Sequence, residues 1–509
     1  MCHYCFQPMV IQPIAAARPG GFMRREISFV LNGSIHHTSD CAGDMTLLDW
    51  LREQPHLRGT KQGCGEGDCG ACTVSIARPD ANGNLVYRPV NACILFMGMV
   101  NGAAIRTVEG LATCGDQLHP VQAAMVENDA SQCGFCTPGF VMTLYTAYQN
   151  GSGLGPDEVD DTIAGNLCRC TGYRPIVEAA VSLDTKKHES RSQNEDLALL
   201  ASLDDGIDVC CDKGGSQFMV PATSVSFANL YAEHPDATII GGATDVGLWV
   251  TKQHRKLEKM IWTGGVAGFD AINDDGDVIR INPAVTHQQF LSYVAEDLPQ
   301  CAELLRRFGA LQVRSSGTVC GNIANASPIG DLPPVLISLN GAVELTEDGA
   351  SRLVRLEDFF IEYGKQDRKA SEFVSALLIP KGAKPNLRCY KISKRFDQDI
   401  SAVMLAANLE ITDGVIDGVR LAFGGMAGIP KRASSAEAVL AGNSPEIASF
   451  KKAAAALADD FTPMSDMRGS ARYRLLTAQN LLVKYGLELV SGKQMRLAGQ
   501  GLFASLEGW

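Results

Sequence analysis

Eight cysteines, arranged in two groups, constrain this chain more than any other feature of its sequence. The first group has the spacing C-x4-C-x2-C followed by a distant fourth cysteine, and its members are Cys64, Cys69, Cys72 and Cys93. Plant-type ferredoxins use this spacing to hold a 2Fe-2S cluster with four thiolates. The sequence therefore predicts a 2Fe-2S cluster held by one loop and a neighbouring element.

Glycines lie between the cysteines of this first group, at Gly63, Gly65, Gly67 and Gly70. A residue without a Cβ adopts positive φ at no steric cost, so these positions can turn backbone N–H groups toward the sulfurs. The last three also match G-x-G-x-x-G, but a dinucleotide fingerprint has to follow a strand and open a helix, with an acidic residue about 20 positions further on. Because cysteines stand between these glycines, we interpret the segment as a cluster loop.

The second group consists of Cys133, Cys136, Cys168 and Cys170, with the spacing C-x2-C, a gap of 31 residues, and C-x-C. The surrounding apolar residues recur at helical spacing, so two loops at helix ends are expected to hold a second cluster. Structural zinc also takes four thiolates and stays an alternative for both groups. The spacing of the second group distinguishes an iron-sulfur cluster from a zinc site less clearly than the spacing of the first group does.

More than half of the 17 cysteines lie between residues 41 and 170. In a chain of this length such clustering indicates metal binding in a reducing compartment, so we expect a cytoplasmic protein and not a disulfide scaffold. Seven of the cysteines outside the two groups are expected to be small buried residues rather than ligands. These are Cys41, Cys114, Cys210, Cys211, Cys301, Cys320 and Cys389.

Charge and hydropathy exclude two classes of partner. The net charge of -12 does not suggest the clustered Lys and Arg that phosphate binding needs. No stretch approaches the roughly 20 apolar residues that span a bilayer. We therefore expect neither nucleic acid nor a membrane as the main partner.

The first folded elements are expected soon after Met23. Residues 26–40 predict a hairpin, because apolar residues alternate and Asn32-Gly33 is the preferred two-residue turn. Residues 45–53 have helical spacing, with Asp44 as the expected N-cap. These patterns predict a small β domain.

Helical spacing dominates residues 105–183, and Pro138 and Pro175 stand where helices are expected to begin. We predict a helical bundle there. Residues 184–216 are polar and aperiodic at both ends, which is typical of a linker between domains. The mixed α/β region beyond them is too large for a single small module.

The motifs GCGEGDCGACTV, QCGFCTPGF and GNLCRCTGYRP resemble the iron-sulfur portion of the xanthine dehydrogenase family of molybdenum hydroxylases. IIGGATDVGLWVTK (239–252), GTVCGNIANASPIGDLPPVL (317–336) and YKISKRFDQDIS (390–401) are similar to the flavin-binding segments of that family. The last motif most resembles bacterial small subunits, which carry iron-sulfur and FAD domains on one polypeptide.

The resemblance implies a multidomain α+β fold. Its expected parts are a disordered extension (1–23), a plant-type ferredoxin β-grasp domain (24–104), an all-α helical-bundle 2Fe-2S domain (105–183), a linker (184–216), an α/β FAD-binding domain (217–385) and an α+β flavoprotein C-terminal domain (386–509).

A flavin site is indicated first by the loop Gly241-Gly242, whose N–H groups suit a pyrophosphate, although a plain turn is the alternative. The resemblance extends the site and also implies that Gln132 contacts a pterin cofactor of a partner. The FAD residues it implies are Gly241, Gly242, Ala243, Thr244, Asp245, Phe308, Thr318, Gly321, Asn322, Asn325, Ser327, Ile329, Asp331 and Lys391.

Two residues depart from the family pattern. Cys320 stands where glycine is common, and Ala243 stands where glycine or asparagine is usual. If either position requires positive φ, the side chain has a steric cost that glycine avoids.

The resemblance also implies what the chain does. Substrate hydroxylation occurs at molybdenum in this family, so no catalytic residue for that step is expected here, and a molybdopterin-binding large subunit is the expected partner in a heterotetramer with two of each chain. Electrons are expected to pass from molybdenum through the helical-domain cluster, the ferredoxin-like cluster and FAD to NAD+, during oxidation of hypoxanthine and xanthine to urate. The loop KRFDQD (394–399) lies near the flavin in the family and affects the choice of acceptor.

Three alternatives stay open at the level of sequence. The same electron-transfer parts serve oxidation of aldehydes, nicotinate or carbon monoxide. A zinc-stabilised scaffold without enzymatic activity is the second alternative, and an NADH reductase without a molybdenum partner is the third.

Overall fold

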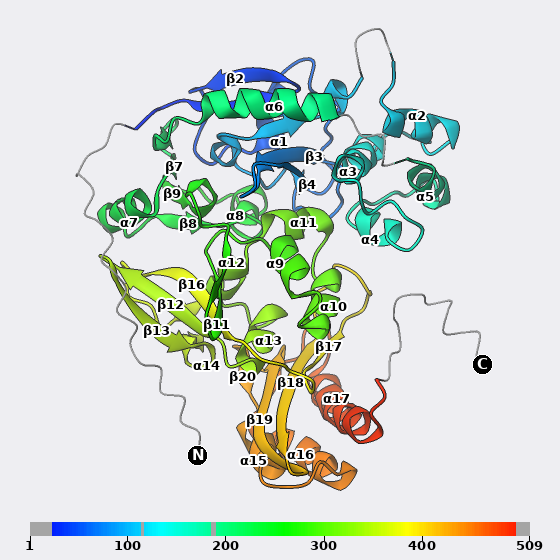
Figure 1. Cartoon of the computed structure of the whole chain (residues 1–509), viewed down its shortest axis with the longest axis vertical. Coiled ribbons are helices and arrows are strands. Elements are labelled where there is room, and N and C mark those ends of the chain that lie inside the picture. The colour runs from blue at the N-terminus through cyan, green and yellow to red at the C-terminus, as the bar shows by residue number, and fades with distance from the viewer. Residues whose placement is uncertain (1–22, 113–116, 185–189, 495–509) are drawn as a thin grey trace.

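The computed structural model describes residues 23–112, 117–184 and 190–494. Residues 1–22 of the expected extension, and Cys114, lie outside the described residues. From top to bottom, Figure 1 shows a strand-rich unit beside a helical one, a central mixed region, and a sheet covered by helices. The multidomain fold with mixed α and β content agrees with the prediction.

The N-terminal unit is a five-stranded sheet in the order β2-β1-β5-β3-β4, in which β1 and β5 are parallel and the other pairs antiparallel. The predicted hairpin is confirmed, because Asn32 and Gly33 take φ values of 51° and 82° in the turn. The strands are β1 (Ile27–Leu31), β2 (Ser34–Thr38), β3 (Thr73–Pro79), β4 (Leu85–Asn91) and β5 (Ala104–Arg106), with the short helices η1 (Met97–Val100) and η2 (Val108–Gly110).

Helix α1 (Leu47–Glu53) packs on this sheet, and its N-cap is Thr46 rather than the predicted Asp44. The Thr46 hydroxyl accepts a hydrogen bond from the Asp49 backbone N–H at 3.1 Å and donates one to the Asp49 carboxylate at 2.6 Å. This pairing satisfies a backbone donor that otherwise has no intrahelical acceptor. The prediction of Asp44 was wrong because the helix begins only at the buried Leu47, which makes Thr46 the N-cap.

The helical unit follows, and its helices begin at prolines as predicted, with Pro138 and Pro175 in the first turns of α3 and α5. Helix α3 ends at Gly151, which takes φ 68°. The helices are α2 (Pro120–Glu127), α3 (Thr137–Asn150), α4 (Val159–Ile163) and α5 (Arg174–Val181).

The segment 184–216, predicted to be a linker that is aperiodic at both ends, contains regular structure. Helix α6 (Ser190–Leu203) lies across the N-terminal sheet (Figure 1), and β6 (Val209–Cys211) begins the next unit. Asp196 of α6 is fully buried, and both of its carboxylate oxygens accept hydrogen bonds from Arg106 at 2.9 and 2.7 Å. This long-range ion pair holds the helix together with Leu200, which is buried in the core of the helical unit.

The central region contains two larger sheets and the two-stranded sheet β14-β15. One has the order β6-β7-β9-β8, with β7, β9 and β8 parallel, and the other is antiparallel with the order β10-β11-β16-β12-β13. Its strands are β7 (Gln217–Val220), β8 (Thr238–Ile240), β9 (Lys259–Trp262), β10 (Ile272–Asp275), β11 (Val278–Ile281), β12 (Ala342–Glu347), β13 (Ala350–Arg355), β14 (Phe360–Glu362), β15 (Lys365–Gln366) and β16 (Phe373–Pro380).

Helices cover and connect these two sheets, and the cavity described below lies between them. They are α7 (Ser224–Glu233), α8 (Val246–Thr251), η4 (Thr263–Gly265), α9 (His287–Val294), α10 (Pro299–Arg307), α11 (Leu311–Ser316), α12 (Val319–Ala324), α13 (Leu332–Ser338) and α14 (Leu356–Phe359).

The C-terminal unit is an antiparallel sheet in the order β17-β18-β19-β20, with three helices packed against it (Figure 1). Phe423 of the sheet and Phe450 and Tyr485 of the helices belong to its fully buried core. The elements are β17 (Arg388–Ile392), β18 (Val403–Thr412), β19 (Val415–Gly424), β20 (Lys431–Arg432), α15 (Ser434–Leu440), α16 (Ile447–Asp460) and α17 (Ala471–Ser491).

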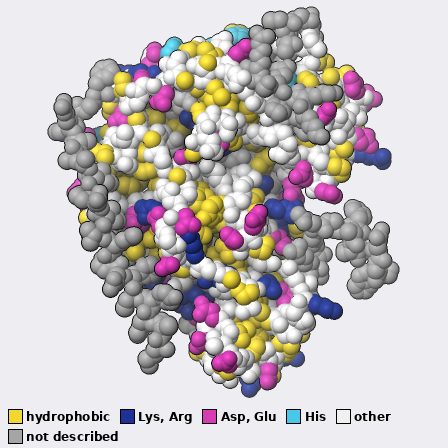
Figure 2. Space-filling view, viewed as in Figure 1, with side chains coloured by type: hydrophobic (Ala, Val, Ile, Leu, Met, Phe, Trp, Pro, Cys, Tyr) yellow, Lys and Arg dark blue, Asp and Glu magenta, His cyan; other side chains and the backbone are white. Residues whose placement is uncertain are grey.

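The surface in Figure 2 carries intermingled acidic, basic and apolar side chains. Among the helices in the described part of the chain, none combines the length and the apolar character that a membrane span requires.

Candidate redox-cofactor sites

The structure brings the four cysteines of the first group together between α1 and β3 and just after β4. The Cys64 side chain is hydrogen-bonded to those of Cys69 and Cys93, and the Cys72 side chain to that of Cys93. These contacts, the one with Cys69 first, lower the pKa of the Cys64 thiol. Four converging sulfurs with a stabilised thiolate suit an iron-sulfur cluster.

Backbone N–H groups surround the Cys64 sulfur, as the interleaved glycines predicted. The N–H groups of Glu66, Asp68 and Cys69 each donate to Cys64 Sγ at 3.4 Å. The loop reaches this geometry because Gly65, Gly67 and Gly70 take φ values of 68°, 78° and 68°. Hydrogen bonds to ligand sulfurs tune the potential of a bound cluster.

The cysteines of the second group meet on two loops at helix ends. Cys136 is the N-cap of α3, and Cys168 and Cys170 lie between α4 and α5. Cys133 is paired with Cys170 and Cys136 with Cys168 through side-chain hydrogen bonds, and the Thr171 N–H donates to Cys168 Sγ at 3.4 Å. Burial raises the pKa of the Cys136 thiol to about 12.

Across residues 23–112, 117–184 and 190–494, no three His, Cys, Asp or Glu side chains are placed to hold a single metal ion. A 2Fe-2S cluster divides its four thiolates between two irons.

The two cysteine groups adjoin through their backbones. The Leu167 N–H, next to Cys168, donates to the carbonyl oxygen of Cys69 at 3.0 Å. Gly70 makes this approach possible, because a Cβ there would lie 2.2 Å from the carbonyl oxygen of Gly165. The two candidate cluster sites are therefore in direct contact within the protein.

Gln312 of α11 joins the central region to both cysteine-bearing units. Its fully buried side chain donates from Nε2 toward Asn166 Oδ1 at 2.9 Å, Thr143 Oγ1 at 3.1 Å and Thr73 Oγ1 at 3.3 Å. Asn166 in turn donates to the carbonyl oxygen of Gly70 at 3.0 Å. One amide therefore ties together three parts of the chain that are far apart in sequence.

We expect Gln312→Met to lower the free energy of unfolding by about 1–3 kcal/mol, because buried polar groups lose a partner without losing their desolvation cost. The measurement is urea unfolding of the purified protein followed by circular dichroism. Gln253→Met, at an exposed position after α8, is the matched control. Equal stability of the two variants would contradict the proposed role of Gln312.

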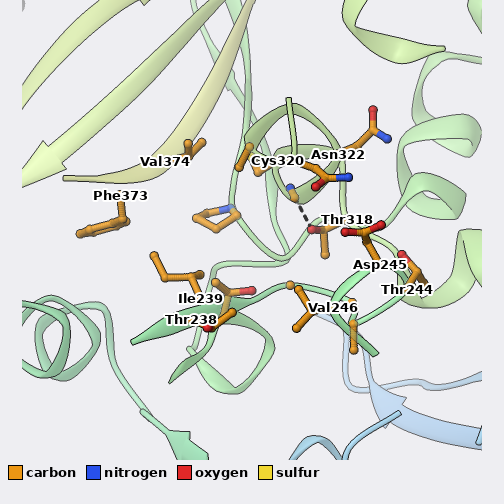
Figure 3. A pocket seen from close by; sticks show the side chains of 18 of the residues that line it. Thr238, Ile239, Thr244, Asp245, Val246, Thr318, Cys320, Asn322, Phe373 and Val374 are labelled. Atoms are coloured by element: carbon orange, nitrogen blue, oxygen red, sulfur yellow. Dashed lines mark hydrogen bonds between the residues drawn. The ribbon is translucent and has the colours of Figure 1, made fainter. Parts of the chain in front are cut away.

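The predicted flavin residues line a cavity of about 360 Å³ between the two central sheets. Figure 3 shows Thr244 and Asp245, from the loop after β8, near Thr318 and Asn322 at the start of α12. Ten of the fourteen predicted FAD residues belong to the lining: Gly241, Gly242, Ala243, Thr244, Asp245, Phe308, Thr318, Gly321, Asn322 and Asn325.

Close backbone packing explains the glycines in this cavity wall. A Cβ on Gly242 would lie 1.9 Å from the carbonyl oxygen of Ser316. Ala243 has φ 57°, so it adopts the left-handed conformation for which glycine or asparagine is usual. Cys320 lies inside α12 with helical geometry, so the anticipated steric cost falls on Ala243 and not on Cys320.

Two buried polar atoms in the cavity wall fit a polar ligand such as FAD. Asn322 Oδ1 and His287 Nδ1 have no hydrogen-bond partner among the described residues. An unpaired buried polar atom costs about 1–3 kcal/mol, which a bound ligand with donor and acceptor groups recovers. The residues present therefore fit the ribityl, diphosphate and ring groups of a flavin dinucleotide.

Five predicted site residues do not line this cavity. Lys391 and Asp331 form a buried ion pair, and Ser401 bonds to both. Ser327 accepts a hydrogen bond from the Ile329 N–H at 3.4 Å. The remaining one, Gln132, is exposed beside Cys133.

His287 is a cavity residue that the sequence reasoning missed. It is 2% exposed, and its ring lies 4.5 Å from the ring of Phe308. Burial lowers the pKa of His287 to about 3, so the imidazole is neutral at ordinary pH. A single histidine within a helical pattern gives no sequence signal of this position.

We expect His287→Leu to weaken FAD binding by roughly tenfold, which corresponds to the loss of about one hydrogen bond. The measurement is flavin retention during dialysis, followed by the fluorescence of the flavin released when the protein is denatured. His56→Leu, at an exposed position, should retain flavin like the unmodified protein. Because the buried imidazole does not titrate in this range, the effect should not change between about pH 6 and pH 8. Unchanged retention in His287→Leu would contradict the assignment.

The first cysteine group is also attached to the cavity wall. Lys252, just after α8, donates to the carbonyl oxygen of Cys64 at 2.8 Å and pairs with Glu66 at 3.2 Å. Cys72 and Cys93 share one hydrophobic core with Ala243 of the cavity loop. The cavity, the first group and the second group therefore adjoin in that order.

The loop 394–399 lies against two other parts of the chain. Arg307 of α10 stacks over the Phe396 ring at 4.4 Å and donates to the Phe396 carbonyl oxygen at 3.1 Å. The Gln398 side chain donates to the carbonyl oxygen of Ala164, in the segment that leads to Cys168. The predicted effect on acceptor choice stays a prediction.

Four family models match the chain and together cover most of it. Their descriptions are the 2Fe-2S iron-sulfur cluster binding domain (29–97), the [2Fe-2S] binding domain (107–181), the FAD binding domain in molybdopterin dehydrogenase (214–382) and the CO dehydrogenase flavoprotein C-terminal domain (388–489).

Curated relatives include several xanthine dehydrogenases. That of Emericella nidulans is 29% identical over 92% of this chain and 39% of its own length. Xanthine dehydrogenase 1 of Arabidopsis thaliana is 30% identical over 82% of this chain and 36% of its length, and that of Drosophila pseudoobscura is 30% identical over 79% and 34%. The chain therefore spans between a third and two fifths of the length of these relatives.

Two solved structures share the fold of about half of the chain. Carbon monoxide dehydrogenase from Hydrogenophaga pseudoflava has a TM-score of 0.50 and 22% identity, and covers 52% of this chain and 94% of its own. Quinoline 2-oxidoreductase from Pseudomonas putida 86 has a TM-score of 0.50 and 23% identity, and covers 54% of this chain and 96% of its own.

Proposed function

Since the chain belongs to the molybdenum hydroxylase family and carries its iron-sulfur and FAD domains, we propose that it is the electron-transfer subunit of a xanthine dehydrogenase. The family matches support electron transfer by 2Fe-2S clusters and FAD. Xanthine and hypoxanthine as substrates and NAD+ as the final acceptor belong to the proposal, and so does a molybdopterin-binding partner subunit.

The contact between neighbouring sites is the observation that carries this proposal. The Leu167–Cys69 hydrogen bond joins the two cysteine groups, and the Lys252–Cys64 hydrogen bond joins the first group to the helix beside the cavity. When bound, iron-sulfur clusters exchange single electrons and a flavin exchanges electrons singly or in pairs. The protein's part is to hold these groups in a fixed order and to tune them by N–H···S hydrogen bonds.

The surface near the second cysteine group supports a partner subunit at that end. Cys133 and Cys170 are exposed, and so is Gln132 beside them. The apolar side chains of Phe135 and Leu167 are 49% and 50% exposed on the same loops. Apolar surface at a cluster site suits a protein that docks there and delivers electrons.

Xanthine-dependent reduction of NAD+ by the purified complex tests the proposal. We expect NADH to form at a rate that depends on xanthine, and molybdenum to co-purify with the chain. Activity with an aldehyde or another N-heterocycle, and none with xanthine, would support the electron-transfer role but show that the substrate is not xanthine. NADH oxidation with no molybdenum in the preparation would instead indicate a solitary reductase.

A further inference from the structure

Two cysteines outside both cluster groups meet where the N-terminal unit joins the central region. Cys41 precedes α1, and Cys211 ends β6, yet their side chains are hydrogen-bonded and belong to one buried core. We infer that Cys41 and Cys211 form a reversible disulfide when the protein meets a peroxide, and that this bond ties the ferredoxin-like domain to the FAD-binding domain.

Backbone contacts hold the two segments side by side around this pair. Ala42 forms a parallel β-bridge with Lys213, and the Gly43 N–H donates to the carbonyl oxygen of Ser216 at 3.3 Å. Gly43 packs so closely that a Cβ would lie 2.8 Å from the carbonyl carbon of Gln217. The bridge between the two segments and the hydrogen bond between the two side chains therefore bring Cys41 and Cys211 together, as a disulfide requires.

The contact between the thiols assigns them different roles. The hydrogen bond with Cys211 lowers the pKa of the Cys41 thiol, and the same bond raises the pKa of the Cys211 thiol. Cys41 is therefore the sulfur that becomes the thiolate, which is the reactive form toward peroxides. Cys211 is placed as the resolving thiol.

The reaction is a two-electron oxidation of the pair by a peroxide. The Cys41 thiolate attacks one peroxide oxygen, the O–O bond breaks, and a sulfenic acid and one water form. The Cys211 sulfur then attacks the Cys41 sulfur, the S–O bond breaks, and a second water leaves as the S–S bond forms. Two thiols and one hydrogen peroxide thus give one disulfide and two waters, and a small dithiol reverses the change.

Access to the pair is limited, which suits a bond that forms only under oxidising stress. Both cysteines are 1% exposed, and the ion pair of Asp40 and Lys213 lies beside them at the surface. A molecule as small as hydrogen peroxide needs only local opening at this ion pair. In a reducing compartment the resting state is the dithiol.

The neighbouring Cys210 provides a matched control. It adjoins Cys211 in β6 but packs against a different core, with Met219 and Phe227. Successive residues of a strand point to opposite faces, so Cys210 cannot replace Cys211. A disulfide at 41 and 211 would enclose both cysteine groups in one covalent loop.

The test is mass spectrometry of the full-length protein with its cofactors, treated with hydrogen peroxide, alkylated and digested without reduction. We expect the Cys41–Cys211 peptide to be the main linked product, to disappear with dithiothreitol, and to be accompanied by a rise of several degrees in the thermal unfolding midpoint. Cys210→Ser should keep the linked peptide, and Cys41→Ala and Cys211→Ala should each lose it.

Oxidation of Cys41 to sulfinic acid without linkage would overturn the inference. So would bleaching of the visible absorbance before any linkage, because the cluster ligands would then be the more reactive thiols. The linkage measured in the unmodified protein decides the question even where an alanine variant folds poorly. None of these readouts depends on xanthine turnover, so the proposed function and this inference fail separately.

Discussion

Cys64→Ser is expected to abolish the signal of the plant-type cluster while the second cluster and the flavin stay bound. The Cys64 sulfur accepts three backbone N–H hydrogen bonds and contacts the side chains of Cys69 and Cys93, so it is the best supported sulfur of its group. Mutation of a residue that only supports a metal ligand typically lowers metal affinity or activity about 10–100-fold. Loss of the ligand itself should therefore lower xanthine-dependent NAD+ reduction by about 100-fold or more.

Electron paramagnetic resonance of the reduced variant, with iron and flavin analysis, measures this effect. Cys210→Ser should keep both cluster signals, because Cys210 belongs to neither group. The flavin should stay because Lys252 bonds to the backbone carbonyl of residue 64 and not to its side chain. Loss of flavin together with the cluster signal would show that the two units depend on each other for folding.

Lys391→Met is expected to lower the free energy of unfolding by about 3–5 kcal/mol, because it leaves the Asp331 carboxylate buried without its counter-charge. The Lys391 and Asp331 side chains are 2% and 5% exposed, and Nζ of Lys391 lies 2.5 Å from the Asp331 carboxylate. Lys391 also donates to Ser401 at 3.0 Å. The pair joins β17 of the C-terminal unit to the residue that caps α13.

Denaturant unfolding of the protein, with flavin release recorded in parallel, measures this cost. Lys451→Met, at an exposed position of α16, is the control and should change stability little. The double variant Lys391→Met/Asp331→Asn should recover part of the loss, because no charge stays buried alone. If the single and double variants were equally unstable, the ion pair would not be the cause.

The sequence predicted the features that depend on a short motif. The cysteine spacings anticipated which sulfurs meet, and the glycines between them have the positive φ values that the N–H···S contacts need. Asn32-Gly33 predicted its hairpin because these two residues readily take the positive φ values that the turn needs. The family matches confirm the iron-sulfur and FAD domains.

Features that depend on distant partners were not predicted. Helix α6 is held by the ion pair between Asp196 and Arg106, which are far apart in the chain, and by Leu200 in the core of the helical unit. The motif around Lys391 suggested flavin contact, but the nearest partner of its ammonium group is Asp331. His287 reaches the cavity only through the packing of α9 against the loop that carries Phe308.

The eight sulfurs are proposed to hold two separate binuclear clusters beside a flavin. Electron paramagnetic resonance of the dithionite-reduced protein, with iron and FAD quantified on the same sample, measures both. We predict two distinct 2Fe-2S signals, with about four irons and one FAD per chain. A single paramagnetic species at full iron loading, or zinc in place of iron, would rule out two 2Fe-2S clusters.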